Sequence, residues 1–230
     1  MNTSKTSMKI VLIRAIVVVL LFFVGAVITY NTVYKHPTLP ILKPADFNPK
    51  LVDESLKYSF NDHEVGDFVL INQDGDSVTP KTFNNKIYVA NFIFTTCPGI
   101  CPIMTKKMEN VYQKFFENKN FSIISHSVTP EMDSVPVLKE YAKKHYAVAP
   151  QWHFVTGNRK LIYDLARKHY FAALDEGDGS LQDFVHTENV LLIDPQKRIR
   201  GVYDGTDDED IEKLIQDIEI LFLEYPNLKL

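Results

Sequence analysis

The sequence predicts an α/β domain with a mixed central sheet flanked by helices, and three observations carry this prediction. Short apolar strands alternate with amphipathic helices through the middle of the chain, a strand hairpin follows them, and a last helix closes the chain. Such alternation is typical of parallel strands joined by helices, while a hairpin adds antiparallel pairs. With 230 residues, 45% of them hydrophobic, the chain can form one such domain and an additional N-terminal segment.

The additional segment is an apolar run near the N-terminus. Residues 10–28 are almost entirely apolar, and no charge occurs between Arg14 and Lys35. A helix of this length, about 28 Å, spans the hydrocarbon core of a bilayer. Only basic residues precede it, so we expect residues 1–34 to form a cytoplasmic N-terminus and a single-pass anchor of the cytoplasmic membrane, in contact with lipid through residues 10–30. A cleaved signal peptide is the alternative, but this run is longer than the usual hydrophobic region of a signal peptide and lacks a clear cleavage site.

The rest of the chain is then expected on the outer side of the membrane, periplasmic or equivalent. Residues 35–59 contain prolines among polar residues and are predicted to form a semi-rigid spacer before a folded domain over residues 60–230. Three of the 25 basic residues precede or enter the apolar run, so the exported part carries 22 basic and 29 acidic residues, a net charge of −7. This charge argues against nucleic acid as a partner.

The two cysteines of the chain form its most informative motif. Cys97 and Cys101 follow an apolar run over residues 87–94 that is typical of a strand buried on both faces. Pro102 suits the first turn of a helix predicted over residues 102–117, so both thiols are expected on a strand-to-helix turn, where N–H groups favour thiolate. Two such thiols indicate redox chemistry or a soft metal ion. A purely structural disulfide is disfavoured, because so short a loop constrains the unfolded chain little.

The remaining elements are predicted from periodicity. Runs rich in β-branched and aromatic residues predict strands over residues 68–71, 121–128, 152–155, 189–194 and 198–203. Apolar residues at three- and four-residue spacing predict helices over residues 135–147 and 158–169, and residues 172–185 read as a polar loop. Met104 and Met108 lie on such an apolar stripe, which favours core packing over copper binding. A last helix begins at a capping-box pattern, Thr206 to Glu209, and its apolar face is Ile211, Leu214, Ile215, Ile218 and Leu221.

The sequence resembles the Sco/SenC copper chaperones in four blocks that occur in the family's order. Residues 94–102, Phe-Thr-Thr-Cys-Pro-Gly-Ile-Cys-Pro, are similar to the family's F-T-x-C-P-x-x-C-P, and residues 127–133 to its S-V-D-P-E-x-D. Residues 152–157 are similar to W-x-x-L-T-G, and residues 185–195 to D-H-T…Y-L-I-D-P. The resemblance covers roughly residues 60–225 and implies a thioredoxin-like fold.

The resemblance also implies copper, Cu(I) or Cu(II), bound by Cys97, Cys101 and His186. Copper(I) is soft and prefers thiolate and imidazole ligands, so these residue types suit it. From the residues alone, His186 ranks only slightly above His126 and His153, which also lie beside predicted strands. The resemblance selects His186, and the other histidines are expected to be structural or exposed.

Two positions depart from the family pattern. Val185 replaces the aspartate before the ligand histidine, so Asp183, Glu188 or a backbone carbonyl would have to accept the hydrogen bond that a metal-bound imidazole donates. Thr129 replaces a second aspartate and removes a charge near the predicted site. Neither change removes a ligand.

The function that the resemblance implies is copper delivery to the binuclear copper centre of cytochrome c oxidase. The expected partners are the copper-binding subunit of the oxidase and a copper donor protein or thiol reductase. The alternative is an exported thiol–disulfide oxidoreductase that reduces the cysteines of the oxidase copper-binding subunit. In it Cys97 attacks, Cys101 resolves, and the two form a disulfide when oxidised. Redox thioredoxins usually carry C-x-x-C and a proline before the strand that faces the cysteines. Here the spacing is C-x-x-x-C and His186-Thr187 occupies that approach, which favours copper, although one dithiol can serve both functions.

Overall fold

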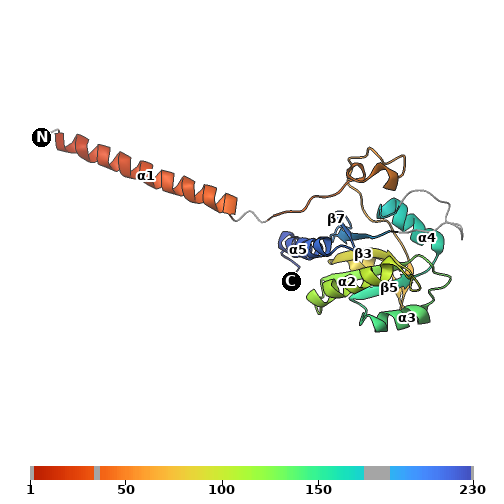
Figure 1. The fold of residues 1–230 in the computed structure, drawn as a ribbon. Helices are drawn as coiled ribbons and strands as arrows, with labels where there is room; N and C mark the ends of the chain where they lie inside the picture. The colour runs from red at the N-terminus through yellow and green to blue at the C-terminus, as the bar shows by residue number, and fades with distance from the viewer. Residues whose placement is uncertain (1–2, 34–36, 174–186, 229–230) are drawn as a thin grey trace. The chain divides into compact units, whose positions relative to one another are not determined.

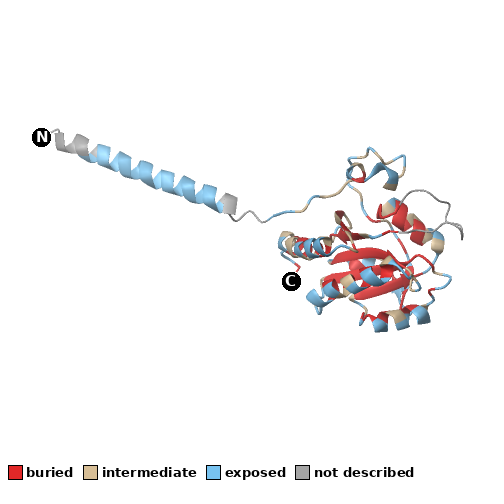
Figure 2. Cartoon of the chain, in the orientation of Figure 1, coloured by how far each residue is buried: buried red, intermediate tan, exposed pale blue. Residues whose placement is uncertain are grey.

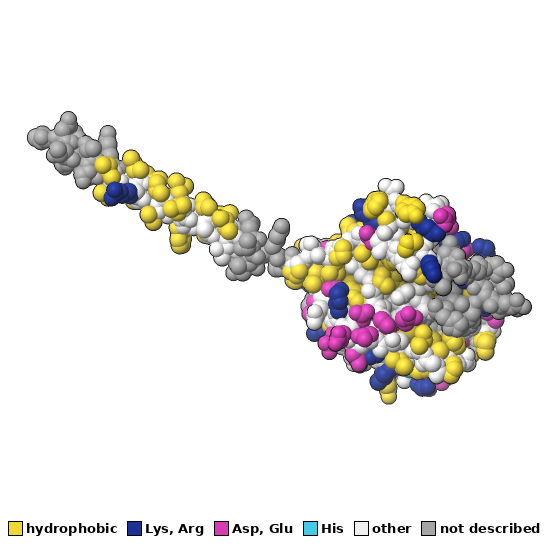
Figure 3. Space-filling model, turned by 45° about the horizontal axis from the view of Figure 1, so that its top comes forward, with side chains coloured by type: hydrophobic (Ala, Val, Ile, Leu, Met, Phe, Trp, Pro, Cys, Tyr) yellow, Lys and Arg dark blue, Asp and Glu magenta, His cyan; other side chains and the backbone are white. Residues whose placement is uncertain are grey.

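The computed structural model describes residues 3–33, 37–173 and 187–228 (Figure 1). The chain divides after Pro37 into two compact units. The first contains helix α1 (Thr3–Val33), and its stretch Ile10–Tyr30 is long and apolar enough to cross a membrane. Apolar side chains cover this helix in Figure 3, and none of its described residues is buried. The predicted apolar span is therefore a continuous helix without a polar face.

The second unit is built on one mixed sheet of seven strands. The strands are β1 (Leu70–Asn72), β2 (Ser77–Val78), β3 (Ile87–Ile93), β4 (Phe121–Ser127), β5 (Trp152–Thr156), β6 (Asn189–Ile193) and β7 (Ile199–Asp204). Their order is β2-β1-β5-β4-β3-β6-β7. The central strands β5, β4 and β3 are parallel, whereas β1 and β6 join them antiparallel. The predicted mixed α/β sheet is confirmed, and only the two-residue strand β2 was too short to be predicted.

Helices cover both faces of this sheet. They are α2 (Ile100–Lys114), α3 (Val135–Lys144), α4 (Arg159–Asp164) and α5 (Asp208–Glu224), with short 3-10 turns η1 (Pro44–Asp46), η2 (Pro49–Leu51) and η3 (Pro80–Phe83). Buried apolar side chains of α2, α3 and α5 form one core cluster, and those of α4 with the segment before β1 form a second. Figure 2 shows the buried residues concentrated in the sheet and on the inner faces of these helices.

The core positions agree with the predicted pattern. Every residue of β3 and β4 is buried, as expected for central strands covered on both faces. Met104 and Met108 on α2 are fully buried, so their assignment to the core is confirmed. On α5, the predicted apolar face packs inward, with Ile215 partly buried and the others buried.

Two helix predictions need correction. Asp207, not Thr206, caps α5: its Oδ1 accepts from the N–H groups of Glu209 (2.7 Å) and Asp210 (3.1 Å). The Thr206 hydroxyl instead donates to Asp204, so the capping-box prediction was wrong. The helix predicted over residues 158–169 is α-helical only to Asp164 and continues as a π-helical turn, η4 (Leu165–His169). Apolar spacing alone does not distinguish this wider turn from an α-helix.

The segment predicted to be a spacer lies within the second compact unit, which begins at Thr38. Phe47 and Val52 are buried in the core, and the Leu42 N–H donates to the Ile199 carbonyl at 2.9 Å. The prolines predict a semi-rigid spacer, but the apolar residues between them attach the segment to the domain.

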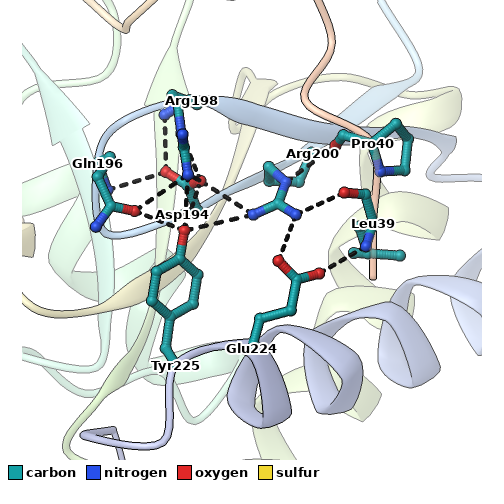
Figure 4. Close-up of polar contacts among 8 residues, drawn as sticks. All are labelled: Leu39, Pro40, Asp194, Gln196, Arg198, Arg200, Glu224 and Tyr225. Carbon is teal, nitrogen blue, oxygen red and sulfur yellow. Dashed lines mark hydrogen bonds and ion pairs between the residues drawn. The ribbon is translucent and has the colours of Figure 1, made fainter. Parts of the chain in front are cut away.

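A buried polar cluster fixes the start of this segment (Figure 4). Arg200 donates to the carbonyls of Leu39 (2.6 Å) and Pro40 (2.9 Å), and it pairs with Glu224 at 2.6 Å and Asp194 at 3.1 Å. One guanidinium therefore joins the segment before β1, the β6–β7 hairpin and the end of α5.

Candidate metal and redox site

The cysteine turn lies at the carboxyl ends of the three parallel strands β3, β4 and β5. β3 ends at Ile93, shortly before Cys97, and the neighbouring strand β4 leads into the loop that contains Asp133. Strand β6 runs antiparallel to β3, so its beginning, after Thr187, lies beside the end of β3. Ligand and catalytic sites of α/β folds form at the carboxyl ends of the strands, where successive loops converge.

The two cysteines occupy different environments on this turn. Helix α2 begins at Ile100 with Gly99 as its N-cap, so Cys101 lies in the first turn and Cys97 just before it. Cys97 is partly exposed, whereas Cys101 is buried with 4% of its surface exposed, and both are free thiols. The predicted strand-to-helix turn, with Pro102 in the first helical turn, is confirmed.

The turn makes the two thiols electrostatically unequal. Burial opposes ionisation of Cys97, but the N–H groups of Cys101, Gly99 and Ile100 and the Cys101 thiol all hydrogen-bond its sulfur, and together they lower its pKa. Burial raises the pKa of Cys101 to about 12, with smaller contributions from Cys97 and Asp133 and an opposing one from the Phe94 N–H. Cys97 is therefore the more accessible and more readily ionised thiol, and Cys101 is the buried thiol that hydrogen-bonds to it.

A buried carboxylate holds the chain just before the cysteines. Asp133 has no exposed surface and accepts from the Thr95 hydroxyl (2.5 Å) and, more weakly, the Thr95 N–H (3.3 Å). It also accepts from the hydroxyls of Ser127 (2.5 Å) and Thr129 (3.0 Å). The carboxylate thus ties the exits of β3 and β4 to the loop before α3. Thr129, which replaces a family aspartate, is a donor to this carboxylate.

Tyr141 of α3 also borders the site. Its hydroxyl shares a hydrogen bond with the Thr105 hydroxyl of α2 at 3.0 Å. The pKa of Tyr141 is raised to about 12, mainly by burial, with smaller contributions from the charges of Cys101, Cys97 and Asp133 and an opposing one from the hydrogen bond with Thr105. The phenol is therefore a neutral group beside the thiols. Sequence reasoning missed Tyr141 and Asp133 as site residues; only the block around Asp133 hinted at its importance.

Two of the three histidines considered for metal binding are buried in the core. His126 and His153 are buried within β4 and β5, and burial lowers the pKa of each to about 4, with the Lys86 charge adding to the effect at His153. Both are neutral core residues, as expected. His186, Val185 and Asp183 lie outside the described residues. Thr187 is described: its buried hydroxyl donates to the Ala172 carbonyl and accepts from the Asn189 N–H.

The described residues supply two of the three predicted copper ligands. Within residues 3–33, 37–173 and 187–228, no group of three or more His, Cys, Asp and Glu side chains is placed to hold a metal ion. Cys97 and Cys101 provide two sulfur donors, one of them partly accessible, which suits a soft ion that prefers few ligands. The same pair has the accessible and inner thiols of a disulfide-exchange site.

Comparison with known proteins gives one consistent answer. The family model described as SCO1/SenC matches residues 57–222. The SCO1 protein homolog of Bacillus subtilis is 32% identical over 159 residues, which cover 68% of this chain and 82% of that protein.

Solved structures agree with this match. BsSco, a member of the Sco family of cytochrome c oxidase assembly proteins in which a disulfide switch was identified, is 31% identical, with a TM-score of 0.59 over 70% of this chain and 94% of that one. ScoI of Arabidopsis thaliana with copper bound is 28% identical, with a TM-score of 0.53 over 69% of this chain and 98% of that one.

Proposed function

Because the chain belongs to the SCO1/SenC family, we propose that it is a membrane-anchored copper chaperone that loads the binuclear copper centre of cytochrome c oxidase during assembly. The observation that carries the proposal is the pair of free, unequal thiols on the turn that opens α2. Cys97 and Cys101 would bind copper as cargo, and His186 would complete the site.

The sheet topology supports the choice of His186. His186 directly precedes Thr187 in the sequence. The hydrogen bonds of the Thr187 hydroxyl hold the start of β6, which lies beside the end of β3 that leads to Cys97. Gly205 also lies here, with its N–H donating to the Glu188 carbonyl at 2.8 Å. Glu188 is exposed, so it remains available to accept a hydrogen bond from an imidazole.

The relatives support the cargo and the partner, and helix α1 supports the location. ScoI of Arabidopsis thaliana was solved with copper bound, and BsSco is described as belonging to a family of oxidase assembly proteins. We infer that the copper-binding subunit of the oxidase receives the metal and that a copper donor or thiol reductase prepares the site. Helix α1 would cross the cytoplasmic membrane, with the folded domain on its outer side.

Thiol–disulfide exchange is the second candidate, and the inequality of the thiols favours it. Cys97 is the more exposed thiol with the lowered pKa, which suits the attacking group, and the buried Cys101 suits the resolving group. In such a reaction the Cys97 thiolate attacks a partner disulfide. Cys101 then displaces the partner, so the partner gains two electrons and Cys97–Cys101 becomes a disulfide. The disulfide switch identified in BsSco is consistent with this chemistry.

Copper titration distinguishes the two candidates. The full chain, reduced and in detergent micelles, is titrated anaerobically with Cu(I) against a coloured chelator and with Cu(II) while the thiolate-to-copper absorption is recorded. We expect one copper per chain, about tenfold or more weaker binding in His186→Ala because one ligand of three is lost, and no binding after oxidation of the cysteines. His63→Ala, which changes a histidine away from the cysteine turn, is the matched control and should bind normally.

The opposite result has a clear meaning. If the wild-type chain takes up no copper while Cys97 exchanges rapidly with protein disulfides, the chaperone proposal fails and the oxidoreductase function stands. If copper binds equally well in His186→Ala, His186 is not a ligand.

A further inference from the structure

Asp133 is a buried carboxylate to which the described residues supply no counter-ion. Its side chain is fully buried, and its four hydrogen-bond donors come from Thr95, Ser127 and Thr129, all of them neutral. In the described part of the chain, no lysine, arginine or histidine pairs with it. Burying an unpaired carboxylate costs several kcal/mol even when hydrogen bonds offset part of that cost. Packing alone does not account for a charge at this position.

The carboxylate is connected to the thiols in two ways. Through Thr95, whose hydroxyl and N–H both donate to it, Asp133 holds the chain two residues before Cys97. Its carboxylate also accepts from Ser127 at the end of β4, which pairs with Ile93 at the end of β3, where the cysteine turn begins. Asp133 can therefore affect both the position of the sulfurs and the energy of any charge placed on them.

The negative charge of Asp133 interacts differently with the copper-bound and copper-free forms of the two thiols. Two thiolates with Cu(II) are neutral overall, whereas two thiolates with Cu(I) carry a net charge of −1. A fixed negative charge nearby repels the second form more than the first. In contrast, the protonated dithiol and the disulfide are both neutral, so the charge discriminates little between them.

We propose that Asp133 is a positioning residue for the Cys97–Cys101 pair and that its uncompensated charge favours Cu(II) over Cu(I) on the two sulfurs. The proposal rests on the copper-binding function proposed above. It assigns Asp133 two separable roles: its hydrogen bonds to Thr95 hold the cysteine turn, and its charge selects the oxidation state of the cargo.

Three variants separate these roles in the full chain. Asp133→Asn removes the charge and keeps the shape. Thr95→Val removes one hydrogen bond to the cysteine turn and keeps the charge. Thr129→Val removes a hydrogen bond of similar kind that does not lead to the cysteines, and it is the matched control. Emission of Trp152, the only tryptophan, reports whether each variant is folded.

Two measurements are made on each variant. The first is the affinity for Cu(II) and for Cu(I), measured anaerobically by competition. The second needs no metal: it is the rate at which iodoacetamide alkylates Cys97 in the reduced chain.

We expect the ratio of Cu(II) to Cu(I) affinity to fall about tenfold in Asp133→Asn, as loss of one partly shielded charge–charge interaction predicts. Thr95→Val should keep the wild-type ratio, weaken both affinities alike and change the alkylation rate of Cys97. Thr129→Val should keep the ratio and the alkylation rate.

An unchanged affinity ratio in Asp133→Asn would overturn the charge role, and an unchanged alkylation rate in Thr95→Val would overturn the positioning role. If Asp133→Asn does not fold, Thr95→Val still tests the positioning role. Because Thr95→Val keeps the charge, a changed affinity ratio in that variant would count against the charge role. If the wild-type chain binds no copper, the proposed function fails, while the alkylation measurement still tests whether the Asp133 tether holds the cysteine turn.

Discussion

Replacing Arg200 by alanine should detach the segment before β1 from the folded domain. Only 3% of the Arg200 surface is exposed, and its guanidinium bonds the carbonyls of Leu39 and Pro40 and the carboxylates of Asp194 and Glu224 (Figure 4). Among the described residues, only Arg200 donates a hydrogen bond to the carbonyl of Leu39, so truncation removes two of the hydrogen bonds that fix this part of the chain. The bonds from the Leu39 N–H to Glu224 and from the Leu42 N–H to Ile199 remain. The cost is therefore both electrostatic and structural.

The size of the effect follows from what remains after truncation. Removing one member of a buried ion pair typically destabilises a protein by about 3–5 kcal/mol, because the other charge stays buried. Here Asp194 keeps a second partner, since the Arg198 Nε lies 2.9 Å from its Oδ2. Tyr225 also donates its hydroxyl to Asp194 at 3.0 Å. We therefore expect the lower end of that range, about 3 kcal/mol in the free energy of unfolding.

Urea unfolding of the full chain in detergent micelles measures this value. Trp152 is the only tryptophan and is fully buried in the core, so its emission reports on the domain. Lys139→Ala is the control: its ion pair with Asp74 spans 3.4 Å between exposed side chains and should contribute less than about 0.5 kcal/mol. Limited proteolysis should also cleave Arg200→Ala near residues 38–42 much faster than the wild-type chain. A loss below about 1 kcal/mol with unchanged proteolysis would refute the role of Arg200 as the residue that fixes this segment.

Two further predictions follow from burial and charge. In the reduced native chain, iodoacetamide should modify Cys97 much faster than Cys101, because Cys97 is partly exposed with a lowered pKa and Cys101 is buried with a raised pKa. Mass spectrometry measures the two alkylation rates, and equal rates in the folded chain would contradict the prediction. Stability should fall as the pH drops from about 6.5 towards 4, because the unfolded chain then binds protons at His126 and His153 that the folded chain, with both pKa values lowered to about 4, does not bind. His126→Gln should make this decrease shallower in urea unfolding at pH 7.5 and pH 5, whatever its effect on absolute stability, and an unchanged pH dependence would exclude His126 as a source.

Much of the fold could be predicted because it depends on local pattern. The runs that became β3 and β4 are β-branched and aromatic throughout, which is required of strands buried on both faces. The order of strands and helices along the chain is then compatible with only a few sheet topologies. The segment before β1 was not predictable in the same way. Its prolines indicate extended chain, but its attachment depends on Arg200, which is 160 residues away from Pro40 in sequence.

The site was predictable only in part, and the reason is physical. The thiols could be placed because a strand, a Cys-Pro-Gly-Ile-Cys turn and a helix are consecutive in the chain, so local rules position them. Asp133 is different. In the sequence it is one more acidic residue in a polar turn, and such residues are usually solvated. Only the parallel pairing of β3 with β4, which brings the ends of the two strands together at Ile93 and Ser127, turns it into a buried acceptor for Thr95.

This difference explains where the chemistry of the site is controlled. Residues that bind a ligand can be recognised from their type and spacing, because the donor atoms must be sulfur or nitrogen. Residues that set the charge around those donors are constrained only by distance, and the fold alone determines distance. Asp133, from the loop between β4 and α3, and Tyr141, from α3, therefore lie near the thiols without any motif that includes Cys97. A relative with the same two cysteines but a neutral residue at the position of Asp133 should bind Cu(I) relatively more strongly, although its copper-binding motif would be identical.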